Sequence, residues 1–157
     1  MKLLFKQKFF SWFDSYDVFD ENGNVYFSVK GKLAFGHAFD IYDKYDNLLG
    51  EVKQRIFHFL PHFDLFINGE EVGTLIKEFT FFKQKFTITC RDWQIEGDWF
   101  EWDYYIKDSA NNIIASISKE LWNWTDTYSI EVDESQALLA LMVVIAIDAI
   151  KCSNDND

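Results

Sequence analysis

Apolar and polar residues alternate along most of the first 132 residues of the chain, most clearly in VYFSVKGK, LLGEVKQR, EVGTLIKE and IIASISKE. Successive side chains of a β-strand point to opposite faces, so this pattern places one set on a core and the other in water. The stretches DENGN, DKYDN, NGEE and DSANN between the runs have the composition of turns, and Asn68-Gly69 favours a tight hairpin. Counting every alternating run predicts about twelve short strands.

Part of this strand pattern repeats along the chain. The segments FSVK (27–30), GEVK (50–53) and GTLIK (73–77) recur at a spacing of 23 residues, and ASISK (115–119) is a fourth copy. An apolar strand and a turn precede these copies, as in FDIYDKYDN, FDLFINGEE and YYIKDSANN. The repeating unit is therefore a β-hairpin, and a dozen or so strands joined by tight turns indicate a barrel or a sandwich.

The pattern changes at residue 133, where VDESQALLALMVVIAIDAIK has neither alternation nor a turn residue. It predicts a helix from about 135 to 151, with Asp133 or Ser135 as the N-cap and Lys151 suited to the negative end of the helix dipole. Such a helix would be about 25 Å long.

The apolar run 137–147 within this helix allows three interpretations. A membrane span needs about 20 mainly apolar residues, and Asp148 would be costly within one. A helix that docks on a partner has a polar face, which this run lacks. A helix that is apolar on all sides is expected to be enclosed, so we interpret the chain as mainly β, a closed antiparallel barrel of about twelve strands around a C-terminal helix.

Length and composition fit one domain, over residues 1–152, followed by a disordered acidic tail at 153–157. The net charge of −11 is unevenly spread, because residues 94–157 carry 3 Lys and Arg against 13 Asp and Glu. This charge argues against a nucleic-acid ligand and against nonspecific attraction to anionic membranes. The start MKLLFKQKFF does not fit a signal peptide, and two cysteines make no disulfide framework. We therefore expect a cytoplasmic protein that is not an integral membrane protein.

Seven segments of the chain resemble the bacterial form of the LURP-one-related family, which belongs to the tubby C-terminal-like fold group. They are FSWFDSYDVFDENGN, YDKYDNLLGEVKQ, HFLPHFDLFINGE, KEFTFFKQKFTI, DWQIEGDWFEWDY, IASISKELWNWTDTYSIEV and ALLALMVVIAIDAI. The resemblance implies a twelve-stranded barrel around a central C-terminal hydrophobic helix. Relatives of this fold include phosphoinositide-binding tubby domains and phospholipid scramblases, but a shared fold does not by itself transfer an activity.

Motifs for chemistry are few. The chain has no nucleophile elbow, no phosphate-binding glycine loop and no calcium loop, and we expect no cofactor, no metal and no catalytic residue. His58 and His62, Cys90 and the acidic stretch IEGDWFEWDYY each have a simpler structural interpretation. The one candidate for contact with an anion or a lipid headgroup is a basic patch of Lys53, Arg55, Lys77, Lys83 and Lys85.

The sequence therefore favours a non-enzymatic binding or scaffold module. Its ligand would be an anionic lipid headgroup or a protein partner, recognised on the outer surface of the barrel, since a filled barrel has no large cavity for a substrate. Peripheral membrane association is compatible with this prediction. The alternative is a membrane-associated, scramblase-like protein whose helix can leave the barrel. Asp148, a carboxylate inside an apolar helix, must find hydrogen bonds or shift its pKa upward.

Overall fold

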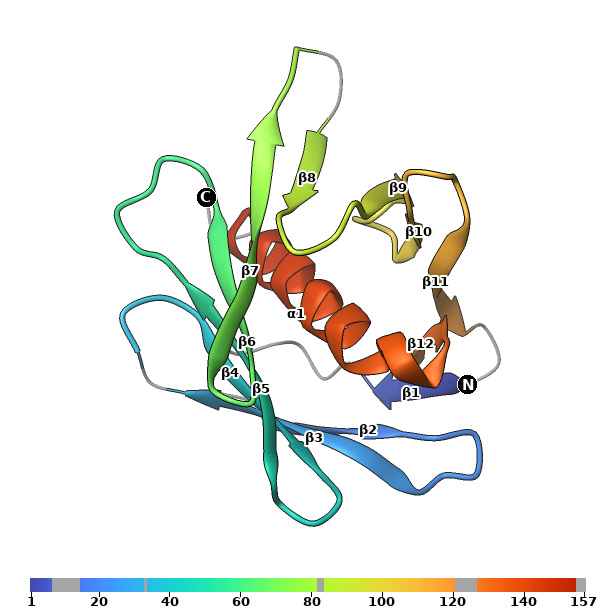
Figure 1. Ribbon diagram of the computed structural model, residues 1–157. Coiled ribbons are helices and arrows are strands. Elements are labelled where there is room, and N and C mark those ends of the chain that lie inside the picture. The colour runs from blue at the N-terminus through green and yellow to red at the C-terminus, as the bar shows by residue number, and fades with distance from the viewer. Residues whose placement is uncertain (7–14, 33, 82–83, 121–126, 155–157) are drawn as a thin grey trace.

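The computed structural model of the chain describes residues 1–6, 15–32, 34–81, 84–120 and 127–154 (Figure 1). Twelve β-strands precede a single α-helix. The strands are β1 (Lys2–Lys6), β2 (Tyr16–Phe19), β3 (Val25–Lys32), β4 (Ala38–Asp43), β5 (Leu48–Gln54), β6 (His62–Ile67), β7 (Glu70–Phe79), β8 (Gln84–Ile88), β9 (Gln94–Asp98), β10 (Asp103–Lys107), β11 (Ile113–Glu120) and β12 (Thr127–Val132), followed by the 3₁₀ helix η1 (Glu134–Gln136) and by α1 (Ala137–Asn154).

All twelve strands belong to one antiparallel sheet, in the order β8-β7-β6-β5-β4-β3-β2-β1-β12-β11-β10-β9. Strands that follow one another in the sequence are hydrogen-bonded neighbours, except β8 and β9, and β12 returns to pair with β1. In that pair Lys2 lies opposite Glu131, and the N-terminal amine of Met1 donates a 2.9 Å hydrogen bond to the carbonyl of Val132. The sheet curls around α1, which confirms the predicted fold class and strand number (Figure 1).

The barrel is nearly closed. Its two edge strands are β8 and β9, and no ladder among the described residues joins them. Side chains cover part of this seam: the ring of Phe86 on β8 lies 5.2 Å, edge to face, from the ring of Trp99, just after β9. The predicted closure is therefore achieved by packing at the seam and by hydrogen bonds elsewhere.

Helix α1 fills the interior of the barrel. Every residue from 139 to 150 is buried, and the side chains that meet the helix are the inward members of the alternating strands, such as Val52, Leu65 and Leu75. The segment Glu134–Ser153 is long and apolar enough, by length and composition alone, to cross a bilayer, yet 72% of it is buried inside the barrel. The prediction of an enclosed helix is thus confirmed.

The ends of the helix differ in detail from the prediction. Asp133, one of the two predicted N-cap residues, occupies the N-cap position of η1 with an extended backbone, but its side chain makes no capping hydrogen bond. The hydroxyl of Tyr26 instead donates a 2.9 Å hydrogen bond to Glu134, which ties η1 to β3. At the other end the helix runs on to Asn154, beyond the predicted residue 151. Residues 153 and 154 of the predicted tail are thus helical, and 155–157 lie outside the described residues.

The antiparallel order gives the barrel two distinct ends. The connections β3–β4, β5–β6, β7–β8 and β9–β10 lie at one end, because successive hairpins of a meander alternate between its ends. Helix α1 finishes at this same end, where Lys151 donates a hydrogen bond to the carbonyl of Phe100 and Ser153 lies 3.2 Å from His37. The β2–β3, β4–β5, β6–β7 and β10–β11 turns, and the start of α1, occupy the opposite end.

Three turns at that opposite end are built alike. Asp20, Asp43 and Asp108 each accept a hydrogen bond from the backbone of the asparagine four residues later, at 2.9, 2.9 and 2.8 Å, and each also bonds its side-chain amide. These hydrogen bonds lower the pKa of all three carboxyl groups. The stretches DENGN, DKYDN and DSANN are therefore turns, as predicted, and they share an Asp-to-Asn pairing.

Candidate interaction sites

The predicted basic patch is centred on the outer face of β5. The ammonium nitrogen of Lys53 lies 2.5 Å from a carboxylate oxygen of Glu51 on the same strand. The guanidinium group of Arg55 lies 2.7 Å from a carboxylate oxygen of Asp64 and 3.5 Å from one of Glu71. Lys32 at the end of β3 belongs to the same surface, because its ammonium nitrogen lies 2.6 Å from a carboxylate oxygen of Asp40 and 3.8 Å from one of Glu51. We call this set of seven charged residues the charged wall. It consists of Lys32, Asp40, Glu51, Lys53, Arg55, Asp64 and Glu71.

The other predicted members of the patch lie elsewhere. Lys77 is on the inner side of β7, in register with Phe86, and only 2% of it is exposed. Its ammonium lies 5.1 Å from the centre of the Trp99 ring, and burial lowers its pKa. Lys85 is exposed on β8, opposite Glu78, and Lys83 lies outside the described residues. The structure therefore brings Lys53 and Arg55 together and separates Lys77 from them.

Asp148 is the buried carboxylate of the barrel interior. Only 4% of the residue is exposed, and its Oδ1 atom has no hydrogen-bond partner. Burial raises its pKa to about 7, against a smaller opposing effect of Lys151. The charge of Asp148 in turn adds to the effect of burial in raising the pKa of Tyr16 and of Tyr104, whose hydroxyl groups face the same region. Of the two outcomes predicted for Asp148, a hydrogen bond or a raised pKa, its Oδ1 atom lacks the hydrogen bond and its pKa is raised.

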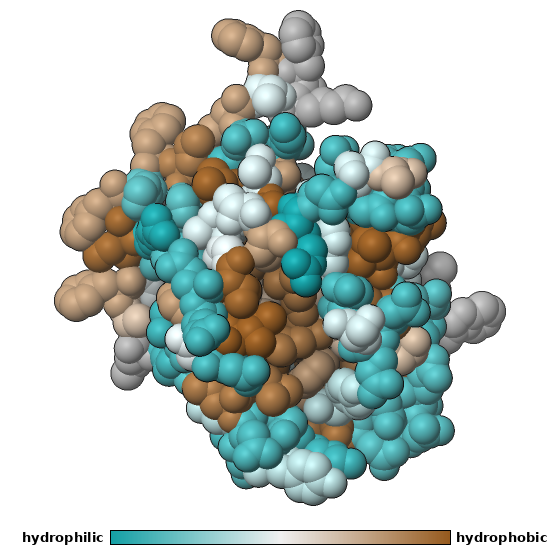
Figure 2. Space-filling model, in the orientation of Figure 1, coloured by the Kyte–Doolittle hydropathy of each residue, from teal (hydrophilic) through white to brown (hydrophobic). Residues whose placement is uncertain are grey.

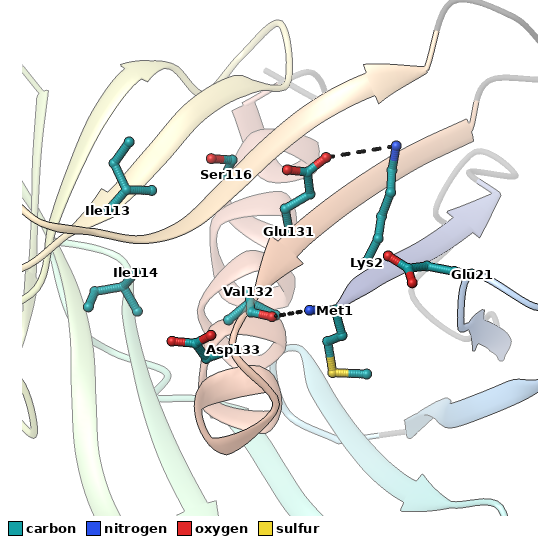
Figure 3. Close-up of a pocket in the computed structure, with 9 residues that line it drawn as sticks. All are labelled: Met1, Lys2, Glu21, Ile113, Ile114, Ser116, Glu131, Val132 and Asp133. Atoms are coloured by element: carbon teal, nitrogen blue, oxygen red, sulfur yellow. Dashed lines mark hydrogen bonds and ion pairs between the residues drawn. The ribbon is translucent and has the colours of Figure 1, made fainter.

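A pocket of about 480 Å³ lies beside the junction of β1 and β12 (Figure 3). Three acidic side chains line it, Glu21, Glu131 and Asp133, together with the ammonium groups of Lys2 and Met1. Lys2 is held by Glu120 at 2.5 Å and lies 3.9 Å from Glu131, and the Met1 amine is bonded to Val132. Both cations are thus satisfied within the protein, and the groups lining this pocket contain no paired nucleophile and base.

A larger groove, of about 680 Å³, lies where α1 enters the barrel. The β2–β3 and β4–β5 turns form its rim through Asp20, Asp43 and Tyr45, while Tyr26 and Leu138 form part of its wall. Asp20 and Asp43 already accept the hydrogen bonds of their own turns. The groove is therefore a structural consequence of the turns and the helix entrance, with acidic groups that are committed to the fold.

Comparison with known proteins places the chain in a family. The model of the LURP-one-related family matches residues 1–148. The chain belongs to the LURP-one-related family. It is 29% identical over 159 residues to the uncharacterized protein YxjI of Bacillus subtilis (strain 168), covering 100% of this chain and 97% of that protein.

A crystal structure from a plant has the same fold. It is that of the Arabidopsis thaliana protein AT5G01750, with a TM-score of 0.64 and 16% sequence identity, over 94% of this chain and 90% of that one. At this level of identity the likeness concerns the fold alone. The family, the barrel and the central helix inferred from the residues are thus confirmed. The names of these two relatives assign no ligand.

The remaining candidate residues have structural surroundings. The rings of His58 and His62 lie with their centres 5.0 Å apart and tilted by 35°, and the described residues contain no group of three or more potential metal ligands. Burial raises the pKa of the Cys90 thiol in spite of Arg91, which makes it a poor nucleophile. In the acidic stretch, Glu96 forms a 2.9 Å ion pair with Lys107, and residues 99–102 form the turn between β9 and β10.

One surface feature is absent from the sequence-based predictions. Four phenylalanines in three connections, Phe35, Phe57, Phe59 and Phe81, are 90–103% exposed. The sequence does not single them out, because the chain has 17 Phe and the same residue type also supplies core positions such as Phe27, Phe39 and Phe63. The signal that could have found them is their position, since FGHAF, IFHFLP and TFFKQ fall between the alternating strands instead of within them.

Proposed function

We propose that the protein is a non-enzymatic binding or scaffold module that recognises a protein partner through the charged wall of β3–β7. The observation that carries this proposal is the filled interior: α1 occupies the space in which a barrel of this size would otherwise hold a ligand. Neither pocket described above converges on titratable groups free to do chemistry. The outer surface is then the place where a ligand can be recognised.

The charge pattern of the wall favours a protein over an anionic headgroup. Its three cations, Lys32, Lys53 and Arg55, alternate with four carboxylates at ion-pair distances. An incoming phosphate would have to displace these carboxylates and then remain beside them, which is unfavourable. A protein surface with charges of both signs can instead complement the alternation, and such complementarity gives specificity and register more than raw affinity.

The scramblase-like alternative requires α1 to leave the barrel. Leaving would expose large apolar side chains such as Leu141, Met142 and Ile147, each of which is worth about 1.5–3 kcal/mol when buried. A binding module keeps these side chains where they are and needs no such rearrangement.

The test is a pull-down with the purified chain immobilised, comparing wild type with the double variant Lys53→Glu/Arg55→Glu. The matched control is Lys107→Glu, the same kind of charge reversal on β10, away from the charged wall, which breaks the ion pair of Lys107 with Glu96. We expect a protein retained by wild type and by the control to be lost from the double variant, and its measured Kd to rise at least tenfold. The proposal fails if the double variant retains the same proteins with the same Kd, or if wild type retains none at low salt.

A further inference from the structure

We propose that the end of the barrel at which α1 finishes rests on a lipid bilayer, with four phenylalanine side chains inserted into its interface. We call these residues, Phe35, Phe57, Phe59 and Phe81, the aromatic loop end. This surface is distinct from the charged wall. The inference is compatible with the proposed scaffold role, since a wall that binds a protein and an end that binds a bilayer would hold the partner at a membrane.

The aromatic loop end is assembled from three connections that are neighbours in space. Phe35 lies between β3 and β4, Phe57 and Phe59 lie between β5 and β6, and Phe81 follows β7. The sheet order makes these three hairpins adjacent along one rim of the barrel. In Figure 1 they project at the top and left, and in Figure 2 apolar groups stand out from the body of the protein along the same margins.

Burial separates these phenylalanines from those of the core. The four side chains are 90–103% exposed, whereas Phe5, Phe27, Phe39, Phe63 and Phe86 are at most 4% exposed. A phenylalanine carries about 150–250 Å² of surface, so four of them present on the order of 600 Å² or more of apolar area to solvent. Apolar exposure of that size on a monomer marks an interaction surface.

The backbone at Phe57 is an independent observation. Its φ angle is +65°, in the left-handed region that disfavours residues with a side chain. Asn or Gly would adopt this conformation at lower cost, and the Phe57 ring is 99% exposed, so no packing within the protein offsets the strain. A strained residue without internal compensation indicates a functional constraint on that position.

The arrangement of the tips favours a bilayer over a protein. The phenylalanines project from three separate loops, and both pockets described above lie at the other end of the barrel. A protein partner would need one recess for each tip, at fixed spacing, whereas the fluid interface of a bilayer accommodates any arrangement of apolar tips. Binding at such an interface scales with the apolar area that is inserted.

The charges of the molecule are placed in a way that suits this orientation. In the described parts of the connections 34–37, 55–61, 80–81 and 99–102, the charged side chains are Arg55 and Glu101. Acidic side chains gather at the opposite end, and hydrophilic residues occupy the lower margin of Figure 2. They include Asp20, Glu21, Asp43, Asp46, Asp108 and Asp133.

The distance between the two ends reduces the repulsion that a net charge of −11 would cause at a membrane. Helix α1 has 18 residues and runs between the ends, which sets them about 27 Å apart. The Debye length at physiological ionic strength is about 8 Å, so the acidic end is screened from a bilayer at the aromatic loop end. Attachment is therefore expected to be hydrophobic, and insensitive to salt.

The experiment is co-sedimentation of the full chain with vesicles of phosphatidylcholine alone, and of phosphatidylcholine with phosphatidylserine. Wild type is expected to bind both, with a partition coefficient that does not fall between 0.1 and 1 M NaCl. The double variant Phe57→Ser/Phe59→Ser is expected to lower it about 100-fold, about tenfold for each inserted ring. Because both rings are solvent-exposed, the variant folds as wild type does. The matched control is Tyr45→Ser, which removes a 73% exposed aromatic ring from the opposite end.

Three results would overturn the inference: no binding of wild type to either vesicle, equal loss in Tyr45→Ser, or binding that needs phosphatidylserine, disappears in high salt and ignores the phenylalanine pair. If the phenylalanine variant loses a protein in the pull-down while wild type binds no vesicle, the loops dock on a protein and the bilayer is excluded. The Lys53→Glu/Arg55→Glu variant separates the two proposals, since it is expected to lose the protein partner and to keep its binding to vesicles.

Discussion

Replacing Asp148 by Asn tests the interior of the barrel through its pH dependence. The wild-type carboxyl group is buried on α1, with one oxygen unpartnered, and burial raises its pKa to about 7 from an ordinary value of 3.8. In the unfolded chain the group ionises at the ordinary value. Between these two pH values the folded protein holds a proton that the unfolded chain has released, so the free energy of unfolding decreases as pH rises.

The size of the effect follows from the difference of about three pKa units. Each unit is equivalent to 1.36 kcal/mol, so ionisation of Asp148 costs the fold about 4 kcal/mol above pH 7 and nothing below pH 3.8. Between pH 5 and pH 8 the loss is about 3 kcal/mol. An asparagine has the same shape and cannot ionise, so it removes this loss.

Urea unfolding at pH 5 and at pH 8 measures the effect. Subtracting the free energy of unfolding of wild type from that of Asp148→Asn gives the stability difference at each pH. We expect this difference to be about 3 kcal/mol larger, in favour of the variant, at pH 8 than at pH 5. Taking the difference between two proteins cancels the titration of groups that they share. The control is Asp46→Asn, at a turn where the side chain is 84% exposed, which is expected to follow wild type at both pH values. A difference between Asp148→Asn and wild type that does not change with pH would refute the reasoning.

Four further substitutions test other parts of the structure. Leu139→Asp places a charge on helix α1, where Leu139 is buried, and is expected to abolish soluble folding. If the helix instead leaves the barrel at membranes, the variant is expected to fold as a soluble protein and to fail to bind vesicles. Gly73→Ala places a Cβ atom 2.5 Å from the Cβ atom of Cys90 and should lower the free energy of unfolding by about 1–3 kcal/mol. Gly50→Ala meets the Met142 sulfur at 3.2 Å and the Phe66 carbonyl oxygen at 3.3 Å and should cost less, as urea titration can check. Phe57→Asn relieves a φ angle of +65° and should raise Tm by about 2–4 °C in calorimetry; an unchanged or lower Tm would mean that the loop is not strained.

Much of the fold could be predicted from residue patterns, because a half-buried strand and an enclosed helix leave strong signatures. Alternation gave the strands, and the eleven apolar residues of 137–147 could not be stable unless enclosed. The family resemblance agreed with both. The family model over residues 1–148 and the twelve-stranded sheet confirm these predictions.

The charged residues were harder to place, because alternation says which residues share a face but not how neighbouring strands align. Lys77 falls on the inner face with Leu75, although a lysine is expected outside, and the Trp99 and Phe79 rings beside it compensate in part. The ion pair of Arg55 with Asp64 depends on the register of β5 with β6, in which Lys53 lies opposite Asp64. No pattern within one strand contains that register.

The aromatic loop end was hidden for a related reason. A phenylalanine that belongs to the core and one that faces solvent are the same letter in the sequence, and Phe57 is only six residues away from the fully buried Phe63. The difference lies in whether the residue falls within a strand, and strand boundaries are the least certain part of a prediction from a single sequence.

Hydrogen exchange with and without phosphatidylcholine vesicles tests the central claim most directly, namely that α1 is the fixed core and that function resides on the outside of the barrel. The account predicts that the amides of α1 remain protected when vesicles are added, and that protection increases in the connections 34–37, 55–61 and 80–81. Loss of protection along α1 on addition of vesicles, with no change in these connections, would contradict it and would favour a helix that leaves the barrel.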